Sequence, residues 1–172
     1  VDASHPSLNR ARIRGADFVA YKGVRPSAHG TAVAAILVGE QTSVFMGLSP
    51  GAELYAASVF AQGKSGSVVA TAESLVRALD WMVKQRVTVI NMSLSGPANE
   101  LLEVAINRAA ERGSFVVAAV GNAGPHAKPL YPAAYPAVVA VTAVDKNSRI
   151  FLVFGGTSKN CSFNQRCNIV RC

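Results

Sequence analysis

Short apolar runs without polar alternation are the feature of this sequence that most constrains its fold. They are Glu53–Phe60, Val87–Met92, Ser114–Val120 and Ala137–Val144, and they are rich in valine and alanine. Strands that are apolar on both faces are typical of a sheet covered on both sides, and such sheets are usually parallel. The chain is therefore expected to contain a buried, parallel sheet.

Helical patterns lie between these strands. Apolar residues recur at helical spacing across Ser67–Arg86 and Asn99–Arg112. Ser65 or Ser67 is suited to cap the first helix, and Gly113 to end the second. Crossovers of this length allow successive parallel strands. The sequence thus predicts an α/β fold of three layers, with a mostly parallel sheet and helices on both faces.

Composition and charge exclude several classes of protein. Half of the 172 residues are hydrophobic and 16% are charged, which suits one globular domain and not a disordered chain. No apolar run approaches the roughly 20 residues of a membrane helix, so no membrane span is expected. The net charge is +7, but the basic residues are scattered and not interleaved with aromatics. Nucleic-acid binding is therefore not expected.

Three segments carry residues suited to chemistry. His29 precedes Gly-Thr and a small apolar stretch, where it could act as a proton acceptor or serve only to start a helix. Asn122, between glycines after a strand, could donate to an oxyanion or form an ordinary turn. Asn91–Gly96 runs from a strand into small polar residues, which could pair with a peptide or simply leave the sheet.

In their order and spacing, these segments resemble the subtilisin-like serine proteases, the subtilases of peptidase S8 type. The resemblance rests on His29-Gly-Thr, Asn91-Met-Ser-Leu-Ser-Gly, Ala118-Ala-Val-Gly-Asn-Ala-Gly and Tyr131-Pro-Ala-Ala-Tyr-Pro, with Ser4–Leu8 and Gly47–Ala52 in addition. It runs from Val1 to about Ile150. The fold that it implies is the subtilisin-like α/β domain.

The resemblance implies a serine endopeptidase that cleaves peptides or proteins through an acyl-enzyme. It makes His29 the general base and Asn122 the oxyanion-hole donor. Ser93, Leu94, Ser95 and Gly96 match a strand that pairs with substrate, Ser65 and Gly66 the opposite edge of the cleft, and Ala119, Val120 and Gly121 a wall of the specificity pocket. It also implies a secreted or periplasmic protein, although the chain contains no signal peptide. Its oligomeric state stays open.

Two members of the family's catalytic triad depart from the pattern. The family aspartate opens an Asp-Thr/Ser-Gly-Ile/Val-Asp segment, and Val1-Asp2 resembles its last two residues. The catalytic aspartate would then stand three residues before Val1, and Asp2 would be the second acid. Ser158 in Gly-Thr-Ser is the candidate nucleophile. No apolar helix pattern follows it and it lies only 36 residues after Asn122, which favours a chance tripeptide.

We therefore expect a subtilisin-like domain truncated at both ends, with 1–150 as a partial catalytic domain and 151–172 as a divergent tail. The tail holds Cys161, Cys167 and Cys172, whose spacing fits no zinc site. The chain by itself is expected to be inactive, and a non-catalytic pseudo-protease that binds peptides is the alternative. A nucleotide-binding domain is a third, weaker hypothesis because Gly63-Lys64-Ser65 lacks the first glycine of a phosphate loop. No cofactor or metal is expected. Calcium is common in the family, but Gly39–Ser43 offers few oxygen ligands.

Overall fold

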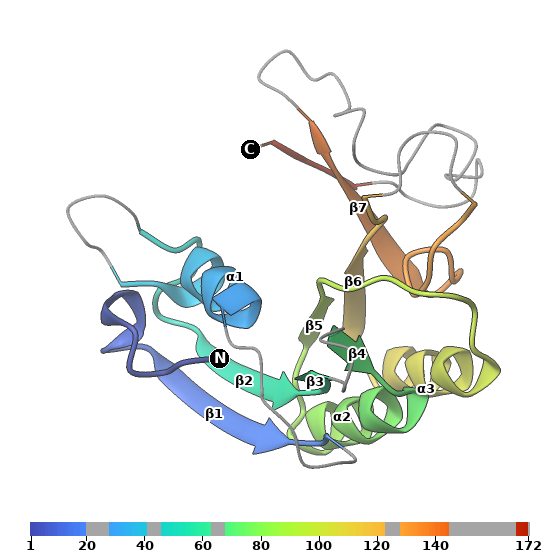
Figure 1. Ribbon diagram of the computed structural model, residues 1–172, viewed down its shortest axis with the longest axis horizontal. Coiled ribbons are helices and arrows are strands. Elements are labelled where there is room, and N and C mark those ends of the chain that lie inside the picture. Colours follow the sequence, from blue (N-terminus) through green and yellow to red (C-terminus); the bar gives the residue numbers. More distant parts are fainter. Residues whose placement is uncertain (20–27, 41–45, 63–67, 123–127, 145–167, 172) are drawn as a thin grey trace. The chain divides into compact units, whose positions relative to one another are not determined.

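The computed structural model describes residues 1–19, 28–40, 46–62, 68–122, 128–144 and 168–171 (Figure 1). The chain forms two compact units, Val1–Ala78 and Leu79–Cys172. Both units combine helices with strands, and most of the strand pairs are parallel. The predicted α/β class with a mostly parallel sheet is confirmed.

The first unit is built around one parallel strand pair. Its elements begin with the 3-10 helix η1 (Pro6–Leu8), strand β1 (Arg12–Asp17), helix α1 (Ala28–Val38) and strand β2 (Glu53–Ser58). Strand β1 pairs with β2 in parallel, with Arg12 opposite Glu53. Leu8, Ala34 and Val38 form a buried cluster against which Ile13 and Leu54 pack. One face of the strand pair therefore lies on η1 and α1.

A short hairpin follows, and here the predicted helix Ser67–Arg86 is partly wrong. Strand β3 (Phe60–Gln62) pairs in antiparallel fashion with β4 (Val68–Ala70), and helix α2 runs only over Ala72–Lys84. The predicted helix from Ser67 fails in its first turn because the β-branched Val68 and Val69 favour a strand. Thr71 takes the capping role instead, its Oγ1 accepting a hydrogen bond from the Ser74 N–H at 3.1 Å.

The second unit contains a four-stranded parallel sheet. Its strands, in spatial order, are β5 (Val89–Met92), β6 (Phe115–Ala119), β7 (Val138–Val144) and β8 (Asn168–Arg171). Helix α3 (Glu100–Glu111) joins β5 to β6, packs against β6 and buries Leu102, Ile106 and Ala109. The predicted strands β5, β6 and β7 and the predicted helix α3 are confirmed to within two residues at each end.

The ends of α3 follow the signals in its sequence. Asn99 is the N-cap, and its Oδ1 accepts a hydrogen bond from the Leu102 N–H at 3.0 Å. Gly113 has φ +86°, the left-handed conformation that commonly ends a helix, and the Ser114 N–H then bonds back to the Ala109 carbonyl at 3.0 Å. These local bonds place the carboxyl end of β5 and the start of β6 at opposite ends of one helix.

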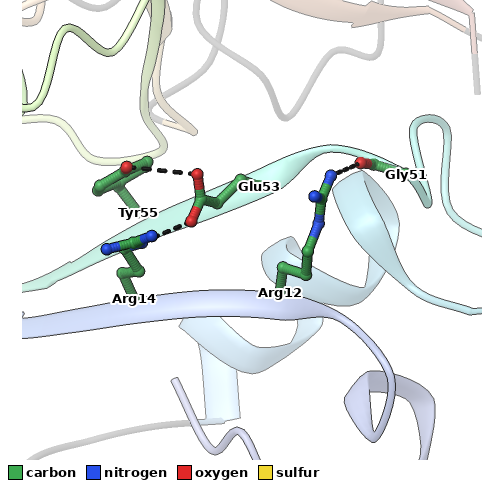
Figure 2. Close-up of polar contacts among 5 residues, drawn as sticks. All are labelled: Arg12, Arg14, Gly51, Glu53 and Tyr55. Atoms are coloured by element: carbon green, nitrogen blue, oxygen red, sulfur yellow. Dashed lines mark hydrogen bonds and ion pairs between the residues drawn. The ribbon is translucent and has the colours of Figure 1, made fainter.

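An exposed polar cluster joins β1 to β2 on the face away from α1. Figure 2 shows Arg14 Nε donating to Glu53 Oε1 and Arg12 donating to the Gly51 carbonyl. The Tyr55 hydroxyl donates to the other Glu53 oxygen at 3.3 Å, and the Arg14 guanidinium lies 5.9 Å from the centre of the Tyr55 ring. The hydrogen bond from Arg14 lowers the pKa of Glu53 below its usual value of 4.5.

Glu53→Gln is expected to remove a pH-dependent part of the first unit's stability. Because the folded-state pKa is lowered, the stabilisation is present above about pH 4.5 and is lost as the pH falls through the folded value. The Tm of the wild-type chain should therefore exceed that of Glu53→Gln at pH 7, and the two values should converge near pH 3.

Glu73→Gln is the matched control, because Glu73 is an exposed partner of Arg77 at 3.6 Å within α2. Such pairs contribute little, so this change should leave Tm nearly unaltered at both pH values. A Tm difference for Glu53→Gln that is the same at pH 3 and pH 7 would contradict the assignment.

Candidate functional site

The carboxyl ends of β5 and β6 lie side by side in the second unit. The two strands are parallel, and Met92 pairs with Ala118. Ser93–Gly96 therefore leaves the sheet next to Val120–Asn122. Ligand sites in parallel sheets form at this edge. The structure thus brings together two groups of predicted site residues, the substrate strand and the pocket wall with its asparagine.

Gly121 is the point of contact between these two segments. It is buried and has φ +91°, a conformation that favours glycine. A Cβ at this position would lie 3.3 Å from Ser95 Oγ and 2.5 Å from Leu130 Cδ1. The missing side chain lets the loop after β6 pack directly on Ser95. Asn122, the next residue, is exposed.

The side chains around Gly121 are small. Ala119 is exposed and Val120 is half-buried, and the Val120 N–H donates to the Val141 carbonyl of β7 at 3.0 Å. Short side chains at these two positions leave room beside the strand ends. The Val120–Val141 bond extends the β6–β7 pairing by one residue and fixes where Gly121 and Asn122 begin.

The segment predicted to pair with substrate, Ser93–Gly96, is also held from its far end. Gly96 and Tyr131 form an antiparallel bridge, in which the Gly96 N–H donates to the Tyr131 carbonyl at 2.8 Å and the Tyr131 N–H donates back at 2.9 Å. At the near end, Asn91 Nδ2 donates to Ser93 Oγ at 2.8 Å, and the Leu94 N–H donates to the Met92 carbonyl at 2.8 Å. Ser93–Gly96 is therefore tied to the scaffold at both ends.

Two tyrosines in the segment before β7 complete this region. The rings of Tyr131 and Tyr135 lie 4.6 Å apart, centre to centre, and Tyr135 is only 2% exposed. The Tyr135 hydroxyl bonds to both the N–H and the carbonyl of Asn99, each at 2.8 Å. Tyr131-Pro-Ala-Ala-Tyr is part of the family resemblance in the sequence, but no sequence signal predicts a role for these two side chains.

His29 lies in the first unit, as the second residue of α1, and is exposed. The same helical turn holds the first residues of the chain. The Asp2 N–H donates to Thr31 Oγ1 at 2.8 Å, and Val1 Cγ2 would lie 3.5 Å from a Cβ on Gly30. The segment Val1–Asp2 is thereby docked next to the residue predicted to be the general base.

The Asp2 carboxylate is engaged locally. It accepts hydrogen bonds from the Ser4 hydroxyl at 2.6 Å and the Ser4 N–H at 3.0 Å, which lower the pKa of Asp2 below its usual range. These hydrogen bonds favour the ionised carboxylate and hold it against the turn at Ser4. The interpretation of Asp2 as the second acid of its motif stays a prediction.

Several predicted residues lie outside the described part of the chain. They are Ser65 and Gly66, the candidate nucleophile Ser158, and Cys161, Cys167 and Cys172. Where the structure is described, no three His, Cys, Asp or Glu residues gather in a group suited to a metal ion. The expectation that the chain carries no cofactor stays a prediction. No helix in the described ranges is long and apolar enough to span a bilayer.

Most of the chain is similar to known proteins. The family model for the subtilase family matches residues 2–170. The thermostable alkaline protease of Halalkalibacterium halodurans is 38% identical over 154 residues, which cover 86% of this chain and 40% of the relative. The minor extracellular protease Epr of Bacillus subtilis is 38% identical over 125 residues, which cover 71% of this chain and 19% of the relative. The chain thus spans less than half of either relative.

Solved structures share the fold. A mutant of the protease domain of PatA superposes with a TM-score of 0.79 at 27% identity. The match covers 92% of this chain and 60% of that one. The arrangement of strands and helices in the two units therefore recurs in a solved protease domain.

Gly121→Ala should destabilise the second unit more than Gly113→Ala. Both glycines have positive φ, so alanine incurs a similar backbone cost at each position. At Gly113 a Cβ meets nothing within 4 Å, whereas at Gly121 it overlaps Leu130. Overpacking costs about 1–3 kcal/mol, so the unfolding free energy of Gly121→Ala should be lower by about 1 kcal/mol or more. Urea denaturation of both variants measures this difference, and equal losses would contradict the close packing at Gly121.

Proposed function

The chain belongs to the subtilase family, and we propose that it forms all or part of a serine endopeptidase that acts on peptides or proteins. A serine attacks the scissile carbonyl and forms an acyl-enzyme. His29 takes the serine proton and returns it to the leaving amine, and Asn122 donates a hydrogen bond to the developing oxyanion. The chain spans 40% of the alkaline protease of Halalkalibacterium halodurans, so the proposal concerns the protein as a whole.

The observation that carries this proposal is the docking of Val1–Asp2 on the first turn of α1. The Asp2 N–H bonds to Thr31 Oγ1, two residues after His29. In the family pattern the catalytic aspartate precedes the position of Val1 by three residues, a distance of at most about 10 Å along the chain. An aspartate at that place would lie within reach of the His29 imidazole and would orient it for proton transfer.

Substrate is proposed to bind along Ser93–Gly96. An extended peptide pairs with such a segment through its backbone, and small side chains allow it to approach closely. The contact between Ser95 and Gly121 supports this role because it brings the peptide-binding strand next to the residue preceding Asn122. Ala119, Val120 and Gly121 would line the pocket for a substrate side chain. Ser65 and Gly66 are proposed for the opposite edge of the cleft.

We also propose that the protein acts outside the cytoplasm. The support is the relative named as an extracellular protease, which matches 71% of this chain. A secreted or periplasmic endopeptidase acts on peptides or proteins in that compartment. The proposal includes no nucleic acid and no other macromolecular partner. No cofactor is included either, because serine, histidine and amide groups suffice for acyl transfer.

The 172-residue chain is proposed to be inactive by itself. Ser158 stands in a context that favours a chance tripeptide, and no other candidate nucleophile matches the family pattern. A non-catalytic, peptide-binding role is the competing proposal for the whole protein. It would be favoured by a full-length protein that binds peptides at Ser93–Gly96 and never forms an acyl-enzyme.

A fluorophosphonate probe, which labels only activated serines, tests the proposal. The full-length protein should be labelled, and His29→Ala should lower the labelling rate by at least about a thousandfold because the base is lost. The 172-residue chain alone should not react. Mass spectrometry of the labelled peptide identifies the nucleophile.

His5→Ala is the matched control. His5 is also an exposed histidine near the start of the chain, and it accepts a hydrogen bond from the Ser7 N–H in η1. This variant should react as fast as the wild type. Labelling that survives His29→Ala would overturn the assigned base, and labelling of Ser158 would overturn the proposed inactivity of the chain.

A further inference from the structure

The residues at the start of α3 supply only part of its N-terminal cap. In a capping box, the side chain at the third helical position accepts a hydrogen bond from the N-cap backbone N–H. Here the N-cap is Asn99 and the third helical residue is Leu102, which has no acceptor. The Asn99 N–H bonds instead to the Tyr135 hydroxyl, 36 residues later in the chain.

A phenol is suited to this position because it both donates and accepts. The Tyr135 hydroxyl accepts from the Asn99 N–H and donates to the Asn99 carbonyl, each at 2.8 Å. The same carbonyl also accepts the Glu103 N–H of α3 at 3.0 Å. Tyr135 thus fixes both backbone groups of one residue outside the helix.

The ring that carries this hydroxyl is held firmly. Tyr135 is 2% exposed and packs on the Tyr131 ring. Tyr131 in turn pairs with Gly96 through two backbone hydrogen bonds. The Tyr131–Tyr135 segment therefore ties both Gly96 and Asn99 to itself, with only Pro97 and Ala98 between the two ties.

We propose that Tyr135 is a positioning residue for extended substrates. Its hydroxyl fixes Asn99, three residues after the Ser93–Gly96 strand, and so holds the backbone of that strand in place to pair with a peptide. This inference rests on the proposed function, since it assumes that Ser93–Gly96 receives the substrate. Without the hydroxyl, Gly96 keeps its bridge to Tyr131, but the turn that continues the strand into α3 is free to shift. Substrates that use only the residue at the scissile bond depend less on this strand.

The test compares two substrates of the full-length protein, a blocked tetrapeptide anilide and a blocked single-residue ester of the same amino acid. Tyr135→Phe should lower kcat/KM for the tetrapeptide by about tenfold, mainly through KM, because the lost hydroxyl loosens the strand that the longer substrate uses. For the single-residue ester, kcat/KM should change less than about twofold.

Asn99→Ala separates positioning from stability. It removes the side-chain cap on the Leu102 N–H but keeps the backbone groups that Tyr135 holds. It should lower Tm, as Tyr135→Phe does, yet leave the ratio of the two kcat/KM values unchanged. Tyr55→Phe, which removes an exposed phenol in the first unit, should alter neither rate.

Equal kcat/KM for the tetrapeptide in the wild type and Tyr135→Phe would overturn the inference alone, as would equal losses in Tyr135→Phe and Asn99→Ala. A wild-type protein that cleaves neither substrate would overturn the proposed function and this inference with it. If phenylalanine prevents folding, para-fluorophenylalanine at position 135 fills the space of the hydroxyl without donating a hydrogen bond, and it gives the same comparison.

Discussion

The parallel pairing of β5, β6 and β7 is the constraint on which the candidate site depends. Met92 pairs with Ala118, and Ala118 pairs with Ala140, so the strand ends arrive at one edge of the sheet. A shift of one residue would turn the alternating buried side chains outward, and burial therefore fixes the register. From that register follow the contact of Gly121 with Ser95 and the exposure of Asn122.

Beyond the sheet, polar contacts between distant segments hold the functional loops. In the second unit Tyr131 bridges Gly96, and in the first unit Thr31 holds the backbone of Asp2. Each contact joins residues 29 or more positions apart and satisfies backbone groups that neither a helix nor a strand would satisfy. These ties fix the backbone of the loops next to His29 and Asn122, the two exposed residues for which catalytic roles are proposed.

Much of this fold could be predicted from sequence, and the failures have physical causes. Helix α3 is confirmed because its cap signals are local. The predicted start of α2 is wrong because Val68 and Val69 fit a helical pattern as well as a strand. The sequence gives no clear signal for strand β1, since Arg12–Asp17 holds three charges in six residues and one large apolar side chain, Ile13. The family followed from the order of its motifs, whereas the contacts of Tyr135 depend on a residue 36 positions away and needed the structure.

We propose that the strand ends of the second unit present Asn122 to the transition state of peptide cleavage. Kinetics of Asn122→Ala in the full-length protein test it most directly, with Asn107→Ala on the exposed side of α3 as the control. We expect kcat to fall by about 10²–10³-fold with little change in KM, the loss that removing one such donor causes in subtilisin. An unchanged kcat, or a loss confined to KM, would contradict it.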